Sequence, residues 1–207
     1  MNLLFWFIIL ILFSIVTSAY SMRHGDDLKC RFEGQKTIHD AVHEYLPNLE
    51  KFYHLYDYLL IIFVLPLIFT KQKYNKLKFL TQLLKVVVPA MFIYCAMTSI
   101  TITGPTTHND RDFGGPLRQA IFGHGSLLLI SGHCCVVFAL VLTMKQFGLI
   151  KSTALWGGLS VAFALFASMS RNHYSIDPIV SFFVISTIFD FVNSRSATKA
   201  VLCGVCR

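Results

Sequence analysis

The sequence predicts an all-α polytopic membrane protein with six transmembrane helices. Hydrophobic residues make up 55% of the 207 residues and charged residues only 14%, whereas a soluble domain carries about 25% charged residues. A single soluble core of this size cannot bury so much apolar surface, but lipid accepts it as solvent. The composition therefore excludes a disordered chain and argues against a soluble globular domain.

Six apolar stretches approach the roughly 20 helical residues that cross about 30 Å of hydrocarbon. The second and sixth are the weakest, because Asp57 lies near the start of one and Asp190 near the end of the other. The first ends in small residues, as a secretory signal does, but it lacks a basic amino-terminal region, which favours an uncleaved anchor over a cleaved signal. The stretches are residues 3–20, 53–70, 86–103, 126–144, 153–170 and 178–193.

Basic residues assign the two sides of the membrane. Lys and Arg cluster after the second and fourth stretches and after the sixth, in segments that alternate along the chain and so share one side. The positive-inside rule places that side in the cytosol, and the net charge of +7 follows from this bias. Segments 21–56, 104–125 and 171–177 then face the exoplasm. We expect a multi-pass protein of the endomembrane system (Golgi or endoplasmic reticulum) or of the plasma membrane.

Two histidine motifs fall on the exoplasmic side. Ser131-Gly132-His133 lies near the start of the fourth stretch, which is its exoplasmic end, and His173-Tyr174-Ser175-Ile176-Asp177 lies between the fifth and sixth. One span down, a loop and one span back separate them, so the two imidazoles can meet at one membrane depth. If the link after His173 is helical, Asp177 lies one turn away and can hold the imidazole N–H.

Two histidines and a carboxylate suit phosphoryl chemistry on a lipid. A neutral His173 attacks phosphorus and forms a phosphohistidine, while Asp177 fixes its tautomer and stabilises the developing positive charge. His133 protonates the leaving oxygen and later takes the proton of the acceptor hydroxyl. This chemistry needs no cofactor and no metal. The alternative is that each histidine only caps a helix end or binds interfacial water.

The motifs resemble those of the sphingomyelin synthase family, which is related to the lipid phosphate phosphatases. Weaker agreement covers Tyr45-Leu46-Pro47-Asn48 before the second span and Phe92-Ile93-Tyr94 in the third. The resemblance implies transfer of a phospho-headgroup from a glycerophospholipid to ceramide, with His133, His173 and Asp177 as the catalytic residues. Together with the apolar stretches and the charge asymmetry, it divides the chain into an anchor or signal-like first span at 1–22, an exoplasmic loop at 23–56, a sphingomyelin synthase-like catalytic transmembrane domain at 57–193 and a cytosolic tail at 194–207.

Departures from the family pattern leave the headgroup open among choline, ethanolamine and inositol. Cys134 follows the Ser-Gly-His motif where the family usually has Thr, Cys95 stands where an Arg usually follows the Tyr of the third span, and Asn48 replaces an Asp. The predicted substrate-binding residues are Gly132, His124, Tyr94 and Tyr174. Gly132 allows close packing and offers its N–H to phosphate, His124 lines the headgroup entrance, and Tyr174 is also expected as an amphipathic interfacial anchor.

A lipid phosphate phosphatase is the first alternative, and a non-enzymatic polytopic lipid-binding protein is the second. Phosphatases of this kind typically carry an Arg six residues before the second histidine, where this chain has Ala167; Arg171 is only two residues away. A phosphate monoester needs cationic clamping more than a diester does, which favours the transferase.

Two minor patterns have ordinary explanations beside the functional ones. His39 and His43 have the spacing of a metal-binding pair but also fit a solvated helix surface. Cys203 and Cys206 fit palmitoylation or two reduced thiols.

Overall fold

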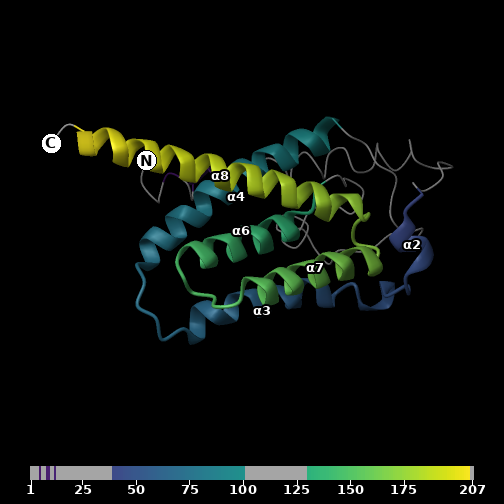
Figure 1. Cartoon of the computed structure of the whole chain (residues 1–207). Coiled ribbons are helices and arrows are strands. Elements are labelled where there is room, and N and C mark those ends of the chain that lie inside the picture. The colour runs from purple at the N-terminus through teal and green to yellow at the C-terminus, as the bar shows by residue number, and fades with distance from the viewer. Residues whose placement is uncertain (1–4, 6–7, 10–11, 13–38, 101–129, 206–207) are drawn as a thin grey trace.

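The computed structural model describes residues 5, 8–9, 12, 39–100 and 130–205. Every regular element from residue 39 to 100 and from 130 to 205 is helical, which confirms the all-α prediction (Figure 1). The elements are α2 (Ala41–Tyr45), the 3-10 helix η1 (Glu50–Phe52), α3 (Leu55–Phe69), α4 (Lys76–Ile100), α6 (Gly132–Gln146), α7 (Thr153–Met169) and α8 (Ile176–Val205).

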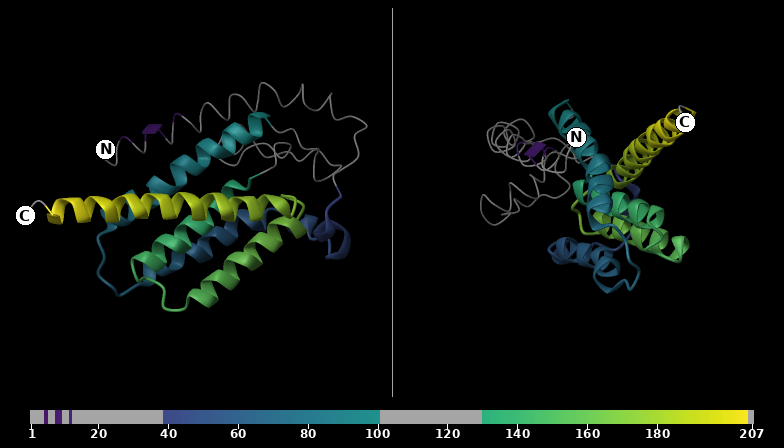
Figure 2. Two further views of the ribbon diagram at one scale, coloured as in Figure 1. Left: turned by 45° about the horizontal axis from the view of Figure 1, so that its top comes forward. Right: turned by 90° about the vertical axis from the view of Figure 1, so that its left-hand side faces the viewer.

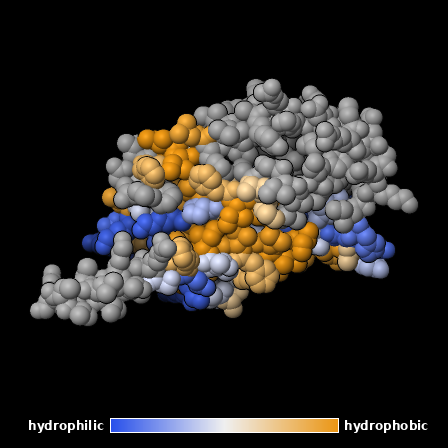
Figure 3. All heavy atoms as spheres, turned by 90° about the horizontal axis from the view of Figure 1, so that it is seen from above, coloured by the Kyte–Doolittle hydropathy of each residue, from blue (hydrophilic) through white to orange (hydrophobic). Residues whose placement is uncertain are grey.

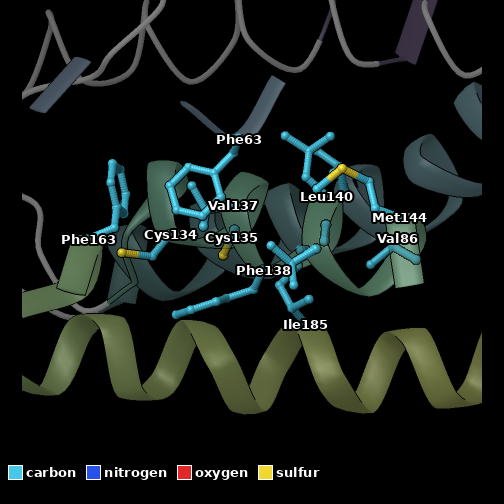
Figure 4. Packing of buried hydrophobic residues seen from close by; sticks show 14 of the residues in the cluster. Phe63, Val86, Cys134, Cys135, Val137, Phe138, Leu140, Met144, Phe163 and Ile185 are labelled. Carbon is cyan, nitrogen blue, oxygen red and sulfur yellow. The ribbon is translucent and has the colours of Figure 1, made fainter. Parts of the chain in front are cut away.

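Helix α6 is the central helix of the bundle and contacts α3, α4, α7 and α8. Its apolar residues are spread around the whole circumference, the pattern of a helix that is buried on all sides. Figure 4 shows side chains from the neighbouring helices converging on it, among them Phe63 of α3, Phe163 of α7 and Ile185 of α8, all nearly inaccessible. Because all four neighbouring helices pack on α6, it sets the positions of these helices and of their ends relative to one another.

The bundle has two chemically different ends. At one end the connections 70–75 and 147–152 meet, since Gln72 Nε2 donates to the carbonyl of Phe147 at 3.4 Å. At the other end lie α2 and the turn after α7, where the Leu49 N–H donates to the Met169 carbonyl at 2.9 Å. Helices α3, α6 and α8 begin at this second end (Figure 1). The lysines of the two connections thus lie opposite both histidine motifs, as the assignment of sides requires.

Helix lengths support membrane spans only in part. Two helices are long and apolar enough to cross a membrane, within Lys76–Tyr94 and Ile176–Ser194, while α3, α6 and α7 have 15 to 17 residues. Figure 2 shows α8 extending beyond the lysine end of the bundle. The first predicted span lies almost entirely outside the described residues, and six spans stay a prediction.

Two predicted starts differ from the helices. The third predicted span, 86–103, belongs to a helix that already begins at Lys76, because a helix continues past the hydrocarbon on polar residues. The fourth begins at Gly132 instead of residue 126, since the Ser131 side chain caps it by accepting the Cys134 N–H. The predicted end of the sixth near Asn193 agrees with the apolar segment Ile176–Ser194, although α8 itself continues to Val205, so most of the predicted tail 194–207 is helical.

Large apolar side chains point outward along the bundle. Figure 3 shows a continuous apolar area in the middle of one face with hydrophilic groups to either side. Exposed apolar surface of this extent is unusual for a soluble monomer and typical of contact with lipid. The exposed residues include Tyr58, Ile61, Ile68 and Phe69 of α3, Leu155 and Val161 of α7, and Phe182, Phe183 and Phe191 of α8.

Candidate active site

A tight turn after α7 positions the first histidine. Arg171 has the left-handed backbone conformation (φ 58°), and the N–H groups of Asn172 and His173 both donate to the Ala167 carbonyl, at 3.0 and 3.2 Å. This arrangement closes a helix and usually has Gly at the left-handed position, since another residue there costs roughly 1–2 kcal/mol. The turn reverses the chain within a few residues and brings His173 to the start of α8.

His173 is paired with Asp177. Its Nδ1 lies 3.1 Å from Asp177 Oδ2, and the Tyr174 N–H donates to the same oxygen at 3.1 Å. The link between the two residues is a turn and not the helix that their spacing allowed, because α8 begins only at Ile176. The Asp177 side chain is 1% exposed and that of His173 is 12% exposed. A neutral imidazole that donates Nδ1–H to a carboxylate carries its lone pair on Nε2, the atom left for a nucleophile.

His133 has a carboxylate of its own. Its Nε2 lies 3.1 Å from Oδ1 of Asp57, in the first turn of α3, and the two side chains are 13% and 23% exposed. The sequence analysis missed this partner and counted Asp57 only as a weakness of the second span. The signal was present, because an ionisable residue within an apolar helix is by default a functional candidate.

Tyr56 lies next to both histidines. Its ring centroid is 4.7 Å from that of His133 and 6.1 Å from that of His173. The phenol is buried and shares a hydrogen bond of 2.9 Å with Ser131 Oγ, in which either hydroxyl can donate. The two histidines predicted to meet are therefore at one end of the bundle, around one aromatic ring.

A buried serine fixes α6 against α8 beside these pairs. Ser181 Oγ accepts the Ser131 N–H at 2.8 Å and donates to the Asp177 carbonyl at 2.7 Å. Both bonds lie in the protein interior, where an unmade hydrogen bond is costly. The helix start that carries His133 is thus tied to the helix start that carries Asp177.

The four predicted substrate-binding residues differ in what the structure gives them. A Cβ on Gly132 would meet only Met91 Cε, at 3.9 Å, an ordinary contact, so packing does not require glycine there. Tyr174 is buried and stacked on His43, with ring centroids 5.3 Å apart, so the expectation of an interfacial anchor is wrong. Tyr94 is half-buried and packs against the hydrophobic cluster. His124 lies outside the described residues.

His39 and His43 do not form a pair. His39 precedes α2 and contacts Glu44 at the surface, with Nε2 to Oε2 at 2.6 Å, while His43 Nε2 lies 3.0 Å from the His173 carbonyl oxygen. Among the described residues, no group of three His, Cys, Asp or Glu side chains is arranged to hold a metal ion. The backbone of Cys203 belongs to α8, its side chain is not described, and Cys206 lies outside the described residues.

Comparison with known proteins adds no relative: no family model matches the chain, and no curated protein sequence matches it.

Proposed function

We propose that this protein is a lipid phosphotransferase similar to the sphingomyelin synthases, which moves a phospho-headgroup from a glycerophospholipid to a ceramide-like alcohol at the exoplasmic face of a cellular membrane. The observation that carries the proposal is the pair of imidazoles, each beside a carboxylate, that both lie next to the ring of Tyr56. Helix caps or interfacial ligands of water would not need two such pairs at one place.

The proposed reaction has two displacements at phosphorus. In the first, the His173 Nε2 lone pair forms the N–P bond, the P–O bond to diacylglycerol breaks, and His133 donates its proton to the leaving oxygen. In the second, the hydroxyl of the acceptor gives its proton to His133 and attacks phosphorus, which releases Nε2. Asp177 balances the positive charge on the phosphorylated imidazole, and Asp57 holds His133 through both proton transfers.

The ends of three helices favour an anion at the same place. Helices α3, α6 and α8 all begin at the end of the bundle that carries the histidines. A helix amino terminus carries a partial positive charge, which stabilises phosphate oxygens. Because Asp57 and Asp177 lie in the first turns of α3 and α8 and oppose this field, a phosphodiester with a single negative charge fits it better than a dianion does.

The surroundings of His173 support a diester over a monoester. Ala167, where the phosphatases carry an arginine, is buried and its carbonyl closes the turn. The Arg171 guanidinium donates to the His43 carbonyl and so helps to hold the turn. A lipid phosphate phosphatase would need a cation at the position of Ala167, which supplies none. A protein that only binds lipid would explain the apolar surface but not the two pairs.

One reconstitution tests the proposal. The purified protein in liposomes is given labelled ceramide with phosphatidylcholine, phosphatidylethanolamine and phosphatidylinositol, and the lipids are separated by chromatography. We expect a new phosphosphingolipid together with diacylglycerol. His173→Ala, His133→Ala and Asp177→Asn should each lower the rate by at least about 100-fold, while His39→Ala, at the exposed surface, leaves it unchanged. Full activity of His173→Ala would refute the nucleophile assignment.

A further inference from the structure

The short helix α2 and the residue before it contact the turn that carries His173. Asp40, the residue before α2, accepts the His43 N–H on Oδ1 at 3.1 Å and the Ser175 N–H on Oδ2 at 2.6 Å. One carboxylate therefore caps the amino termini of both α2 and α8, which are 135 residues apart in sequence at this contact. Partial burial acts to raise the pKa of Asp40, but the N–H groups of Ser175 and His43 outweigh it and hold that pKa below its ordinary value.

His43 completes the contact from the next turn of α2. Its Nε2 lies 3.0 Å from the His173 carbonyl oxygen, and since a carbonyl only accepts, this nitrogen carries the hydrogen. The imidazole stacks on the Tyr174 ring, and Arg171 donates in return to the His43 carbonyl. Residues 173–175 are thus held at three points: the carbonyl of His173, the side-chain ring of Tyr174 and the N–H of Ser175.

These contacts act on the peptide units on both sides of Tyr174. This backbone lies next to the His173 imidazole, the proposed nucleophile, and to the Asp177 carboxylate that holds it. The His173 imidazole reaches Asp177 across this same turn, without a helical backbone to fix the distance. A shift of about 1 Å in a reacting group can cost on the order of 100-fold in rate. A turn held only by its own bonds would leave that distance free to vary.

We propose that Asp40 and His43 are positioning residues of the transfer reaction: from α2 they fix the backbone of residues 173–175 and so hold the His173 imidazole against Asp177. The inference rests on the proposed function. Both residues contact the backbone of residues 173–175 and not the His173 imidazole itself, so we expect their loss to lower kcat and to leave KM nearly unchanged.

Two substitutions remove the contacts one at a time, and each has a matched control. Asp40→Asn keeps the shape but has one acceptor oxygen for two N–H donors, and its kcat should fall about 10- to 100-fold with KM within about twofold. Glu44→Gln removes a carboxylate from the same helix, at the surface, and should leave both constants unchanged. His43→Leu should lose kcat similarly, whereas His43→Gln, whose Nε2 can donate to the same carbonyl, should retain most of it.

Hydrogen exchange separates this inference from the proposed function, because it needs no turnover. The Ser175 amide of the full chain in liposomes should exchange slowly in the wild type and in Glu44→Gln, and faster in Asp40→Asn. If the wild type shows no transferase activity but the Ser175 amide still exchanges faster in Asp40→Asn than in the wild type, the proposed function fails. The contact of α2 with residues 173–175 is then still supported. If the enzyme is active and Asp40→Asn and His43→Leu retain wild-type kcat, the positioning role is overturned.

Discussion

Replacing Asp57 by asparagine tests the carboxylate that the sequence analysis missed. The substitution keeps the shape of the side chain and removes the charge that faces His133 Nε2 at 3.1 Å. In the proposed reaction His133 releases a proton and then recovers one, and a fixed negative charge stabilises the imidazole in its protonated form before and after these transfers. We expect Asp57→Asn to lower kcat with little change in KM for ceramide, because Asp57 acts on His133 and not on the lipid.

The size of this effect follows from exposure. The contact is an ion pair by distance, and two unit charges 3.1 Å apart attract by about 1.3 kcal/mol at the dielectric constant of water and more where water is excluded, which is about 10-fold or more in rate at 1.4 kcal/mol per tenfold. Asp57 is 23% exposed, so water screens part of its charge, and about 10- to 30-fold is expected. Asp177 is 1% exposed and holds two hydrogen bonds, and its loss should cost at least about 100-fold.

The assay is ceramide-dependent formation of diacylglycerol in liposomes, with Asp190→Asn as the matched control. Asp190 is the other acidic residue within a predicted apolar span, and it lies in α8 well beyond the histidine end. Its substitution should leave the rate unchanged. Wild-type kcat in Asp57→Asn beside a slow Asp177→Asn would refute the role of Asp57, and an equal loss in Asp190→Asn would show a general effect of removing acidic residues.

Three further predictions concern topology, substrate and pH. In a cysteine-free background, Glu44→Cys should react with an impermeant reagent added from the exoplasmic side and Lys73→Cys should not; the reverse result would invert the assignment of sides. Phosphatidic acid should release phosphate more slowly than a zwitterionic phospholipid yields diacylglycerol at matched surface concentration, because a dianion lacks a clamping arginine here; faster phosphate release without ceramide dependence would favour the phosphatase. Burial and the neighbouring Arg171 lower the pKa of His43, so protonation of His43 opposes docking of α2. The stability that the neutral imidazole contributes to this docking is present above its ordinary pKa and is lost on acidification. Exchange of the Ser175 amide, corrected for its intrinsic rate, should therefore rise from about pH 7 to about pH 5 in the wild type but not in His43→Gln, and an unchanged wild-type rate would contradict this.

The meeting of the two histidine motifs could be predicted from spacing. A span, a loop and a returning span bring positions about forty residues apart to one end of a bundle, and the structure places His133 and His173 there. The contact between His173 and Asp177 was also accessible, because the two residues are four apart, although a turn and not a helix joins them.

The contacts that distant segments make with the two histidine motifs could not be predicted in the same way. Asp57 and Asp40 contact His133 and Ser175 across 76 and 135 residues, and no periodicity connects such positions. The turn at Arg171 was hidden because its left-handed conformation usually belongs to glycine. Helix ends were missed for another reason: hydropathy marks where hydrocarbon ends, whereas backbone hydrogen bonding continues through Lys76 and beyond Asn193.

The shortness of the helices around the site has a consequence for the bilayer itself. At about 1.5 Å per residue, the 15 residues of α3 and of α6 extend only about 22 Å, less than the roughly 30 Å of a hydrocarbon core. In the membrane arrangement that we propose, α3, whose side chains are exposed along the bundle, thins the lipid next to it, and thinning lowers the phosphate layer toward its first turn, where Asp57 contacts His133. The cost of this mismatch is smallest in the thinnest membranes, so within our proposal the depth at which the histidines meet the lipid headgroups depends on the thickness of the bilayer.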